Sequence, residues 1–423
     1  FSMLHFDADA GVMVTASHNP APDNGYKVYL GGTVVQGDGR GVQIVPPFDA
    51  EIAAAIEAAP PADEVPMNDD LIEAVDPREE YVACASALAS GEASAREDLR
   101  IVLTAMHGVG AAITSRVLSE AGFSHVSLVA AQADPDPDFP TVPFPNPEEA
   151  GALDMAIEQA REQGADLIIA VDPDADRCAL AVPDPTSEMG WSPLSGDQIG
   201  SLLGEFLASR GMKGSLANSI VSSRLLSRIA RAHGLDHHTT LTGFKWIARA
   251  PGLGFGYEEA IGFCPDPAHV RDKDGIATSV VAASLVAALK AQGCSVWDEL
   301  ERLARLHGLH VSSPLTFRVE QIEQIASGMA RLRAQPPSVL AGSPVVEVSD
   351  LSQGYRGLPP TDGVLVLTEA GDRVIARPSG TEPKLKCYLE VILPVAEGEP
   401  LPWEQARERL DSIKGAFAEI IGL

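Results

Sequence analysis

The chain has 423 residues, of which 45% are hydrophobic and 21% charged. This length suits three or four domains at about 150 residues each, and the composition excludes a disordered or fibrous chain. The 59 acidic and 31 basic residues give a formal net charge of −28 at pH 7. Such a chain is repelled by nucleic acid and by anionic membranes, so a phosphate-bearing ligand would need locally concentrated positive groups.

The chain shows no membrane-spanning or secretory pattern. Its longest notable apolar stretch without charge, residues 276–289, suits a buried helix and is too short to cross a bilayer. Residues 1–7 have neither a basic start nor a long apolar run, which argues against a secretory signal. The five cysteines are scattered without a CxxC pair, so we expect reduced thiols and a cytoplasmic location.

The first part of the chain predicts a small set of strands and helices. A short apolar strand is expected at 12–14, and strands at 27–30 and 33–35 flank Gly31-Gly32, a two-residue hairpin signal. The alanine-rich residues 49–59 predict a helix that Pro60 ends. A second helix is expected at 70–90, and the polar residues 91–97 suggest a linker.

From residue 101 onward, strands and helices alternate, which favours doubly wound, largely parallel α/β sheets. The expected strands are 101–104, 125–130, 166–171 and 178–182; the expected helices are 148–163, 195–211, 222–233 and 274–292; the expected loops are 133–147, 240–245 and 255–262. After about residue 310 the pattern indicates a smaller α+β domain, with strands at 315–319, 345–348, 363–368, 373–377 and 386–393.

Two motifs follow predicted strand ends. The sequence Thr15-Ala-Ser-His-Asn-Pro20 displays a serine hydroxyl and an imidazole on an Asn-Pro turn, although a plain turn with a capping serine fits the spacing equally well. Asp172, Asp174 and Asp176 stand at alternate positions after an apolar strand, where carboxylates converge on a divalent cation. The alternative is a solvated acidic turn. An EF-hand is excluded because Arg177 stands where glycine is required.

Three further motifs carry polar groups. Residues 377–384 (RPSGTEPK) combine two hydroxyls, a glycine and two cations, which suits a phosphate, although an ordinary loop between strands remains possible. The adjacent carboxylates in 256–262 (GYEEAIG) could hydrogen-bond a polyol, although this motif alone favours a surface turn. Residues 269–275 place His, Arg and Lys before a helix start, where a capping loop is the alternative. No P-loop, GxGxxG or GxSxG motif occurs.

In this order, the motifs resemble those of the α-D-phosphohexomutase family, from about Gly11 to Leu393. LTGFKW (241–246), GYEEAIG, DKDG (272–275) and SGTEPK are similar to its phosphoglucomutase/phosphopentomutase branch. The resemblance implies that Ser17 is a phosphoserine and that Lys27 is the general acid/base, with His18 assisting. It implies Mg²⁺ bound by Asp172, Asp174, Asp176 and the phosphate on Ser17.

The resemblance also implies substrate-binding roles for twelve residues. They are Thr242, Gly243, Lys245, Glu258, Glu259, Arg271, Lys273, Arg377, Ser379, Gly380, Thr381 and Lys384. Two positions depart from the family pattern. Ala260 replaces a serine common in the family's sugar-binding loop, which corresponds to residues 256–262 here and is called the sugar loop below. No glycine-arginine loop precedes Ser17, so we expect the chain to be truncated at its N-terminus.

The resemblance implies an isomerase that interconverts 1-phosphate and 6-phosphate (or 5-phosphate) sugars through a bisphosphate intermediate, with a sugar bisphosphate as activator and a monomer or dimer as the assembly. It implies successive doubly wound α/β domains around a central cleft, with a smaller C-terminal α+β domain. We expect the domains at 1–95, 96–196, 197–308 and 309–423. A sugar-1,6-bisphosphate synthase and a non-catalytic phosphosugar-binding remnant stay open as alternatives.

Overall fold

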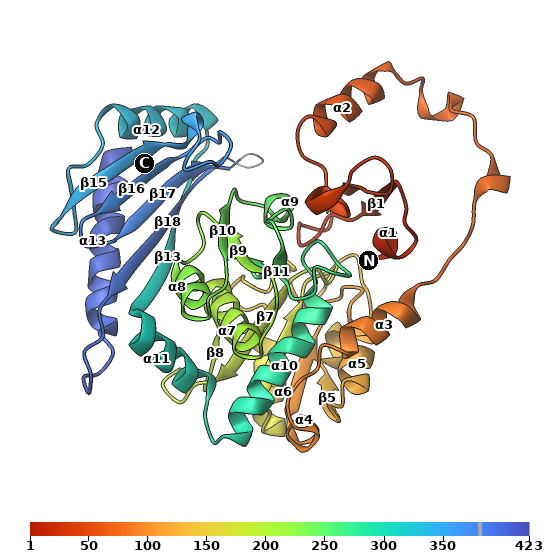
Figure 1. Cartoon of the computed structure of the whole chain (residues 1–423), viewed down its shortest axis with the longest axis horizontal. Coiled ribbons are helices and arrows are strands. Elements are labelled where there is room, and N and C mark those ends of the chain that lie inside the picture. Colours follow the sequence, from red (N-terminus) through yellow and green to blue (C-terminus); the bar gives the residue numbers. More distant parts are fainter. Residues whose placement is uncertain (380–382, 423) are drawn as a thin grey trace.

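The structure, a computed structural model, describes residues 1–379 and 383–422. In these residues the main strands form four sheets of three, five, four and six strands, in chain order. Figure 1 shows the six-stranded C-terminal sheet on one side, the N-terminal sheet on the other, and the two middle sheets with their helices between and below them. The expected α/β class with an α+β C-terminal part is confirmed.

The N-terminal sheet is antiparallel, with β2 (Tyr26–Leu30) between β1 (Ala10–Val14) and β3 (Val42–Gln43). The predicted hairpin at Gly31-Gly32 is therefore wrong, because residues 32–34 form a turn, residue 35 is not in a strand, and β2 pairs with β1 and β3. Asp9 explains the difference. Its Oδ1 accepts hydrogen bonds from the backbone N and the hydroxyl of Thr33, at 2.7 and 2.8 Å, and this caps the turn.

The helices of the first part also differ from the prediction. After α1 (Ser2–His5) and α2 (Phe48–Ala58), the chain forms two short 3₁₀ turns, at Ala62–Glu64 and Asp69–Leu71, before α3 (Arg78–Ser86). The predicted helix at 70–90 is thus wrong in its first half, because Pro77 disfavours helical backbone before it and stands at the helix start. The predicted linker contains α4 (Ala93–Asp98), where Arg96 Nε donates to Ala121 O at 2.9 Å.

The five-stranded sheet holds the acidic run. Its order is β5 (His125–Leu128), β4 (Arg100–Thr104), β6 (Leu167–Val171), β7 (Cys178–Pro183) and β8 (Trp191–Pro193). The first three strands are parallel, β7 runs antiparallel to β6, and β8 runs antiparallel to β7. Helices α5 (Ala111–Glu120) and α6 (Asp154–Gln163) pack against it, α6 beginning six residues later than predicted. The acidic run follows the carboxyl end of fully buried β6, as expected.

The four-stranded sheet has the order β10 (His237–Thr240), β9 (Ser215–Ser219), β11 (Leu253–Glu258) and β12 (Gly262–Cys264). The predicted loop at 255–262 is wrong in its first half, because Phe255 and Tyr257 are fully buried and extend β11. The associated helices are α7 (Gly196–Ser209), α8 (Leu225–Ala232), α9 (Phe244–Ile247), α10 (Gly275–Ala291) and α11 (Val296–His307). Helix α10 contacts elements of both middle sheets, which therefore share one apolar core.

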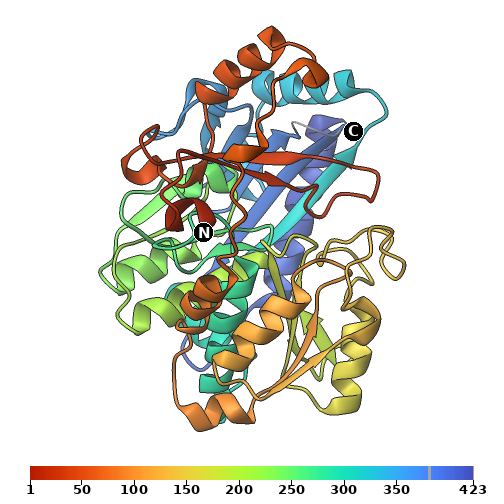
Figure 2. The ribbon, with the colours of Figure 1, turned by 90° about the vertical axis from the view of Figure 1, so that its right-hand side faces the viewer.

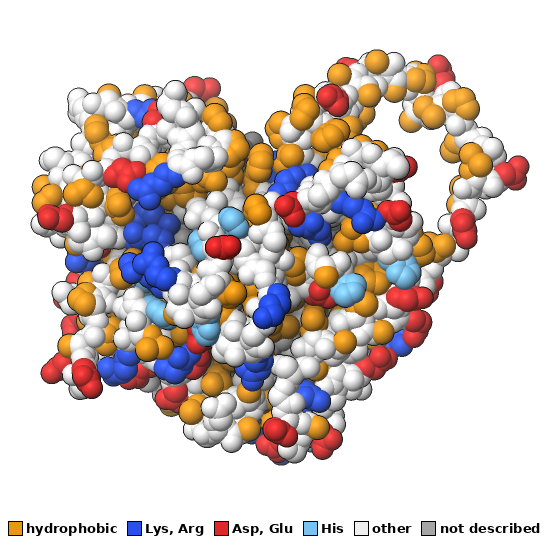
Figure 3. Space-filling model, viewed as in Figure 1, with side chains coloured by type: hydrophobic (Ala, Val, Ile, Leu, Met, Phe, Trp, Pro, Cys, Tyr) orange, Lys and Arg blue, Asp and Glu red, His pale blue; other side chains and the backbone are white. Residues whose placement is uncertain are grey.

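The C-terminal sheet is antiparallel throughout. Its order is β13 (Leu309–Arg318), β18 (Lys384–Leu393), β17 (Arg373–Pro378), β16 (Val364–Thr368), β15 (Ser343–Asp350) and β14 (Val339–Leu340). Helices α12 (Ile322–Ala334) and α13 (Trp403–Ile421) cover one face and enclose a separate apolar core. Figure 2 shows this sheet passing behind the N-terminal strands, and in Figure 3 the surface is notched between the two.

Within the described residues, no single helix is long and apolar enough to cross a membrane, and α10 with α11 meets that test only as a pair bent by 91°.

Candidate active site

Ser17 lies in the loop after β1, where the backbone takes a left-handed conformation (φ 54°) that is unusual for a residue other than glycine. A hydrogen bond from Ser17 N to Thr15 Oγ1 (2.8 Å) holds this turn. The Ser17 hydroxyl lies 3.1 Å from His18 Nδ1 and donates to Asp172 Oδ2 at 3.5 Å. The structure thus brings the predicted phosphoserine next to the acidic loop, although 155 positions separate Ser17 from Asp172.

The three aspartates form a compact group of oxygen ligands. One carboxylate oxygen from each of Asp172, Asp174 and Asp176 lies within 4.8 Å of the others. Among the described residues, Asp174 Oδ1 and Asp176 Oδ1 are buried without a hydrogen-bond partner. Buried carboxylate oxygens need a partner, and a divalent cation coordinated by oxygens would supply one. The donor set therefore fits a hard cation such as Mg²⁺.

Two glycines hold the acidic loop in place. A Cβ on Gly108 would lie 2.6 Å from Pro173 O, and Val109 N donates to the same oxygen at 2.9 Å. On the other side, Gly275 N donates to Ala175 O at 3.1 Å, and a Cβ on Gly275 would lie 2.8 Å from that oxygen. The loop is clamped between the turn after β4 and the start of α10, where only glycine allows so close an approach.

Lysines from two elements neutralise the acidic loop. Lys27 Nζ, on β2, lies 3.1 Å from Asp174 Oδ2 and 2.5 Å from Asp176 Oδ2, and Lys273 Nζ lies 3.1 Å from Asp176 Oδ2. Burial alone would raise the pKa of Asp176, but Lys273 and Lys27 lower it to about 2. Burial also opposes the charge on Lys27, yet Asp176 and Asp174 together raise the Lys27 pKa. These groups are therefore ion pairs at neutral pH.

His18 is a neutral imidazole at neutral pH. Burial and, after it, the charge of Arg177 lower the pKa of His18 to about 4. With Nδ1 beside Ser17 Oγ, a neutral ring can accept the hydroxyl proton or donate one, depending on its tautomer.

The adjacent Glu258 and Glu259 have different surroundings. Glu258 is buried at the end of β11. Burial opposes the charge on Arg177, but the charge of Glu258 raises the Arg177 pKa. Glu258 also adds to the charges of Asp272 and Asp176, which raise the pKa of Lys273 against its burial. Glu259 Oε2 accepts from Ser219 Oγ and Ser222 Oγ, both at 3.0 Å. Glu258 thus faces the cations of the site, whereas Glu259 is tied to the turn after β9.

A cavity of about 320 Å³ adjoins the acidic loop. Residues that line it include Lys27, Tyr29, Asp174, Asp176, Arg271 and Lys273. Arg271 Nη2 donates to Ala248 O at 3.1 Å and lies 3.5 Å from Asp38 Oδ1. The predicted Thr242 and Gly243 lie between β10 and α9, and Lys245 is the second residue of α9. All three are at the carboxyl end of the parallel strands, where ligands bind in α/β sheets.

The C-terminal loop is only partly described. Arg377 is half-buried near the end of β17, and Ser379 N donates to Lys384 O at 2.8 Å. The predicted Gly380 and Thr381 lie outside the described residues. A cavity of about 260 Å³ lies between the C-terminal sheet and the sugar loop. Glu148, Glu259, Ala260, Lys386 and Tyr388 are among its lining residues.

The sequence analysis missed Arg177, Lys386 and Tyr388. Arg177 Nη1 donates to Ala260 O at 2.8 Å and its backbone N donates to Asp172 Oδ1 at 2.9 Å, so it joins the acidic loop to the sugar loop. Its position directly after the acidic run was the available signal. Lys386 and Tyr388 follow Lys384 at a spacing of two, which puts them on one face of β18.

The sequence matches models of all four domains of one family. They are described as Phosphoglucomutase/phosphomannomutase α/β/α domain I (residues 1–62), domain II (79–186), domain III (195–305) and the C-terminal domain (318–400). A Haemophilus influenzae protein named "Probable phosphomannomutase" is 45% identical over 398 residues, which cover 92% of this chain and 79% of that protein.

More distant relatives carry related names. Human phosphopentomutase is 31% identical over 465 residues, covering 99% of this chain and 73% of that protein. The open form of pp63/parafusin, a phosphoglucomutase from Paramecium, matches in structure with a TM-score of 0.71 at 19% identity, covering 98% of this chain and 79% of that one. At this identity the structural match shows the fold alone.

Proposed function

The chain belongs to the phosphoglucomutase/phosphomannomutase family of phosphosugar isomerases, and we propose that it interconverts the 1-phosphate and 6-phosphate (or 5-phosphate) of a sugar through phospho-Ser17 and a sugar bisphosphate. The position of Ser17 carries this proposal. Its hydroxyl lies 3.1 Å from a neutral imidazole and 3.5 Å from the first of three clustered carboxylates. A hydroxyl so placed can carry a phosphoryl group next to a bound cation.

We infer that Asp172, Asp174 and Asp176 hold Mg²⁺ together with a phosphate oxygen on Ser17. Bound there, the ion would offset the charge that the phosphoryl group carries during transfer. The buried Oδ1 atoms of Asp174 and Asp176, which have no hydrogen-bond partner among the described residues, support this assignment.

During the transfer, the protein has to take up one proton and supply another. A sugar hydroxyl oxygen attacks the phosphorus, the bond from phosphorus to Ser17 Oγ breaks, and the hydroxyl proton has to leave as Ser17 Oγ regains one. Lys27 is the proposed general acid/base, and His18, neutral and 3.1 Å from Ser17 Oγ, assists. Positioned groups of this kind contribute about 10²–10⁴-fold to a rate. The second half-reaction runs the same steps in reverse from the other end of the bisphosphate.

The substrate contacts divide between two ends of the site. Glu258 is proposed to accept hydrogen bonds from sugar hydroxyls, with Arg271 and Lys273 nearby. Arg377, Ser379, Gly380, Thr381 and Lys384 are proposed to bind the phosphate that does not react. A bisphosphate that turns over in the site exchanges the positions of its two phosphates. A sugar bisphosphate should therefore also activate the enzyme, by phosphorylating Ser17.

The five free cysteines support a cytoplasmic location.

Labelling tests the proposal. Incubation with glucose 1,6-bisphosphate carrying ³²P should label the wild-type chain on Ser17, and Ser17→Ala should remove the label and the isomerisation of glucose, mannose or ribose 1-phosphate. Ser94→Ala, at an exposed position in α4, is the matched control and should keep both. Label that persists in Ser17→Ala would assign the phosphoryl group to another residue.

A further inference from the structure

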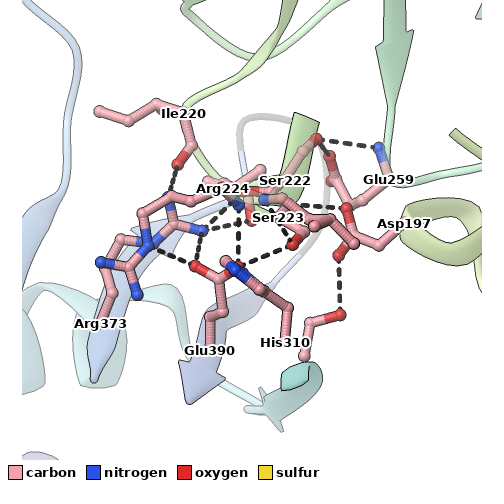
Figure 4. A network of polar contacts seen from close by, with 12 residues as sticks. Asp197, Ile220, Ser222, Ser223, Arg224, Glu259, His310, Arg373 and Glu390 are labelled. Carbon is pink, nitrogen blue, oxygen red and sulfur yellow. Dashed lines mark hydrogen bonds and ion pairs between the residues drawn. The ribbon is translucent and has the colours of Figure 1, made fainter. Parts of the chain in front are cut away.

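A buried carboxylate, that of Glu390 on β18, links the C-terminal sheet to the four-stranded sheet (Figure 4). Glu390 is 1% exposed. It accepts from Ser223 Oγ at 2.7 Å, from Arg224 N at 2.8 Å and from Arg224 Nε at 2.5 Å, all across the interface. Within its own sheet, His310 Nδ1 and Arg373 Nη2 lie 3.2 and 3.4 Å from it.

Two arginines cross this interface in opposite directions. Arg373, on β17 directly opposite Glu390, donates to three consecutive carbonyls of the turn after β9: Ile220 O at 2.8 Å, Val221 O at 3.3 Å and Ser222 O at 2.7 Å. Arg224 reaches back and donates to Gly371 O at 2.5 Å. A planar guanidinium fixed by several acceptors sets orientation as well as distance.

The same turn holds the sugar loop. Ser222 Oγ donates to Glu259 Oε2 at 3.0 Å, and Glu259 N donates back to Ser222 Oγ at 3.2 Å. Asp197, at the start of α7, adds a second link, because it accepts from Ser223 N and from Ser312 Oγ of β13, both at 2.7 Å. An unbroken chain of hydrogen bonds thus runs from the sugar loop to β13, β17 and β18.

The two central strands of this network lead to the C-terminal loop. Arg377 lies four residues beyond Arg373 on β17, and Arg377 and Lys386 are opposite each other, as are Arg373 and Glu390. At about 3.3 Å per residue, the network sits about 13 Å behind Arg377. A small rotation of the strand pair at the network would therefore displace Arg377 relative to Glu258.

We propose that Arg373 and Glu390 are positioning residues that set the distance between the sugar loop and Arg377 at the end of β17. This inference rests on the proposed function. It assigns to the network a role in substrate binding that a buried ion pair serving stability alone would not have. Neither residue touches the reacting atoms.

Kinetics separate positioning from stability. Arg373→Lys keeps a positive charge near Glu390 but cannot reach three carbonyls, so it should raise KM for the sugar phosphate by about 10-fold and change kcat much less. Ser222→Ala should raise KM in the same direction. Val391→Ala is the matched control: it trims a fully buried side chain next to Glu390, lowers Tm, and should leave KM within about twofold.

A distance measurement needs no turnover. Nitroxide labels on Glu162→Cys and Ser327→Cys, both exposed, would be measured by double electron–electron resonance after Cys84 and Cys294 are replaced by serine. Arg373→Lys should shift or broaden the distance distribution, and the Val391→Ala control should not.

Each outcome has a separate meaning. An Arg373→Lys variant with the Tm loss of Val391→Ala but with wild-type KM and distances would overturn the positioning role. A wild-type chain that isomerises no sugar phosphate would instead overturn the proposed function, and the distance measurement would still test the network.

Discussion

At the scale of single residues, Asp174 joins the acidic loop to the Ser17 loop and to β2. Its Oδ2 accepts from Thr15 Oγ1 at 2.9 Å and pairs with Lys27 Nζ at 3.1 Å, while its buried Oδ1 is without a partner among the described residues. Asp174→Asn should therefore weaken Mg²⁺ binding by about 10-fold or more, because an amide is a poorer ligand for a hard cation. Titration calorimetry checks this. Unchanged affinity would place the cation elsewhere, and exposed Asp154→Asn is the control.

Glu259 makes stability depend on pH. Burial, and then the charge of Glu258, raise the pKa of Glu259 to about 7 from an ordinary value of 4.5. Because the folded state binds this proton more tightly, the stability that Glu259 contributes is fully present below pH 4.5 and is lost as pH rises through about 7. Glu259→Gln keeps an acceptor for both serines and should flatten the fall of Tm between pH 5 and 8. Exposed Glu149→Gln should leave the fall unchanged.

At the scale of elements, the turn after β4 should control the acidic loop without supplying a ligand. Gly108→Ala would set a Cβ 2.6 Å from Pro173 O, so Pro173 and its neighbouring carboxylates have to move. We expect a loss of about 1–3 kcal/mol of stability and weaker Mg²⁺ binding. Gly415→Ala in α13, where a Cβ meets nothing within 4 Å, should instead stabilise by about 0.5–1 kcal/mol. Equal Tm and Mg²⁺ affinity for Gly108→Ala and wild type would refute the clamp.

The sequence predicted the elements that a local pattern determines. The buried run of β6 and the alternate aspartates after it share one short segment, so strand and site could be found together. The supposed hairpin at Gly31-Gly32 failed because Asp9, more than twenty positions away, caps the turn. Similarly, no local pattern separates Glu258 from Glu259, since the serines that hold Glu259 come from another strand end. In these last two cases, contacts between segments distant in the sequence determine the structure.

At the scale of the whole molecule, the N-terminal sheet meets the body of the protein mainly through polar contacts. Lys27 pairs with the acidic loop, Tyr29 Oη donates to Asp272 Oδ2 at 2.5 Å, and Arg249 Nη1 donates to Gln43 O at 2.8 Å. Val42 is the residue of this sheet that joins the apolar cluster around α9. Ser17 and Lys27 are therefore held in the site by ionic and hydrogen-bonding contacts more than by shared core.

Proteolysis tests this division of the molecule. Met67, Leu71 and Ile72, between α2 and α3, are 90%, 82% and 75% exposed, and thermolysin cleaves before such side chains. The first cut should fall there, and the N-terminal fragment should stay bound at low salt. It should separate in 1 M NaCl, where charges are screened beyond about 3 Å, and isomerase activity should be lost with it. Replacing the three side chains by aspartate should slow the cut at unchanged Tm, because none is buried. A first cut within the middle sheets, or a fragment that remains bound in 1 M NaCl, would show that the N-terminal sheet is held by more than these polar contacts.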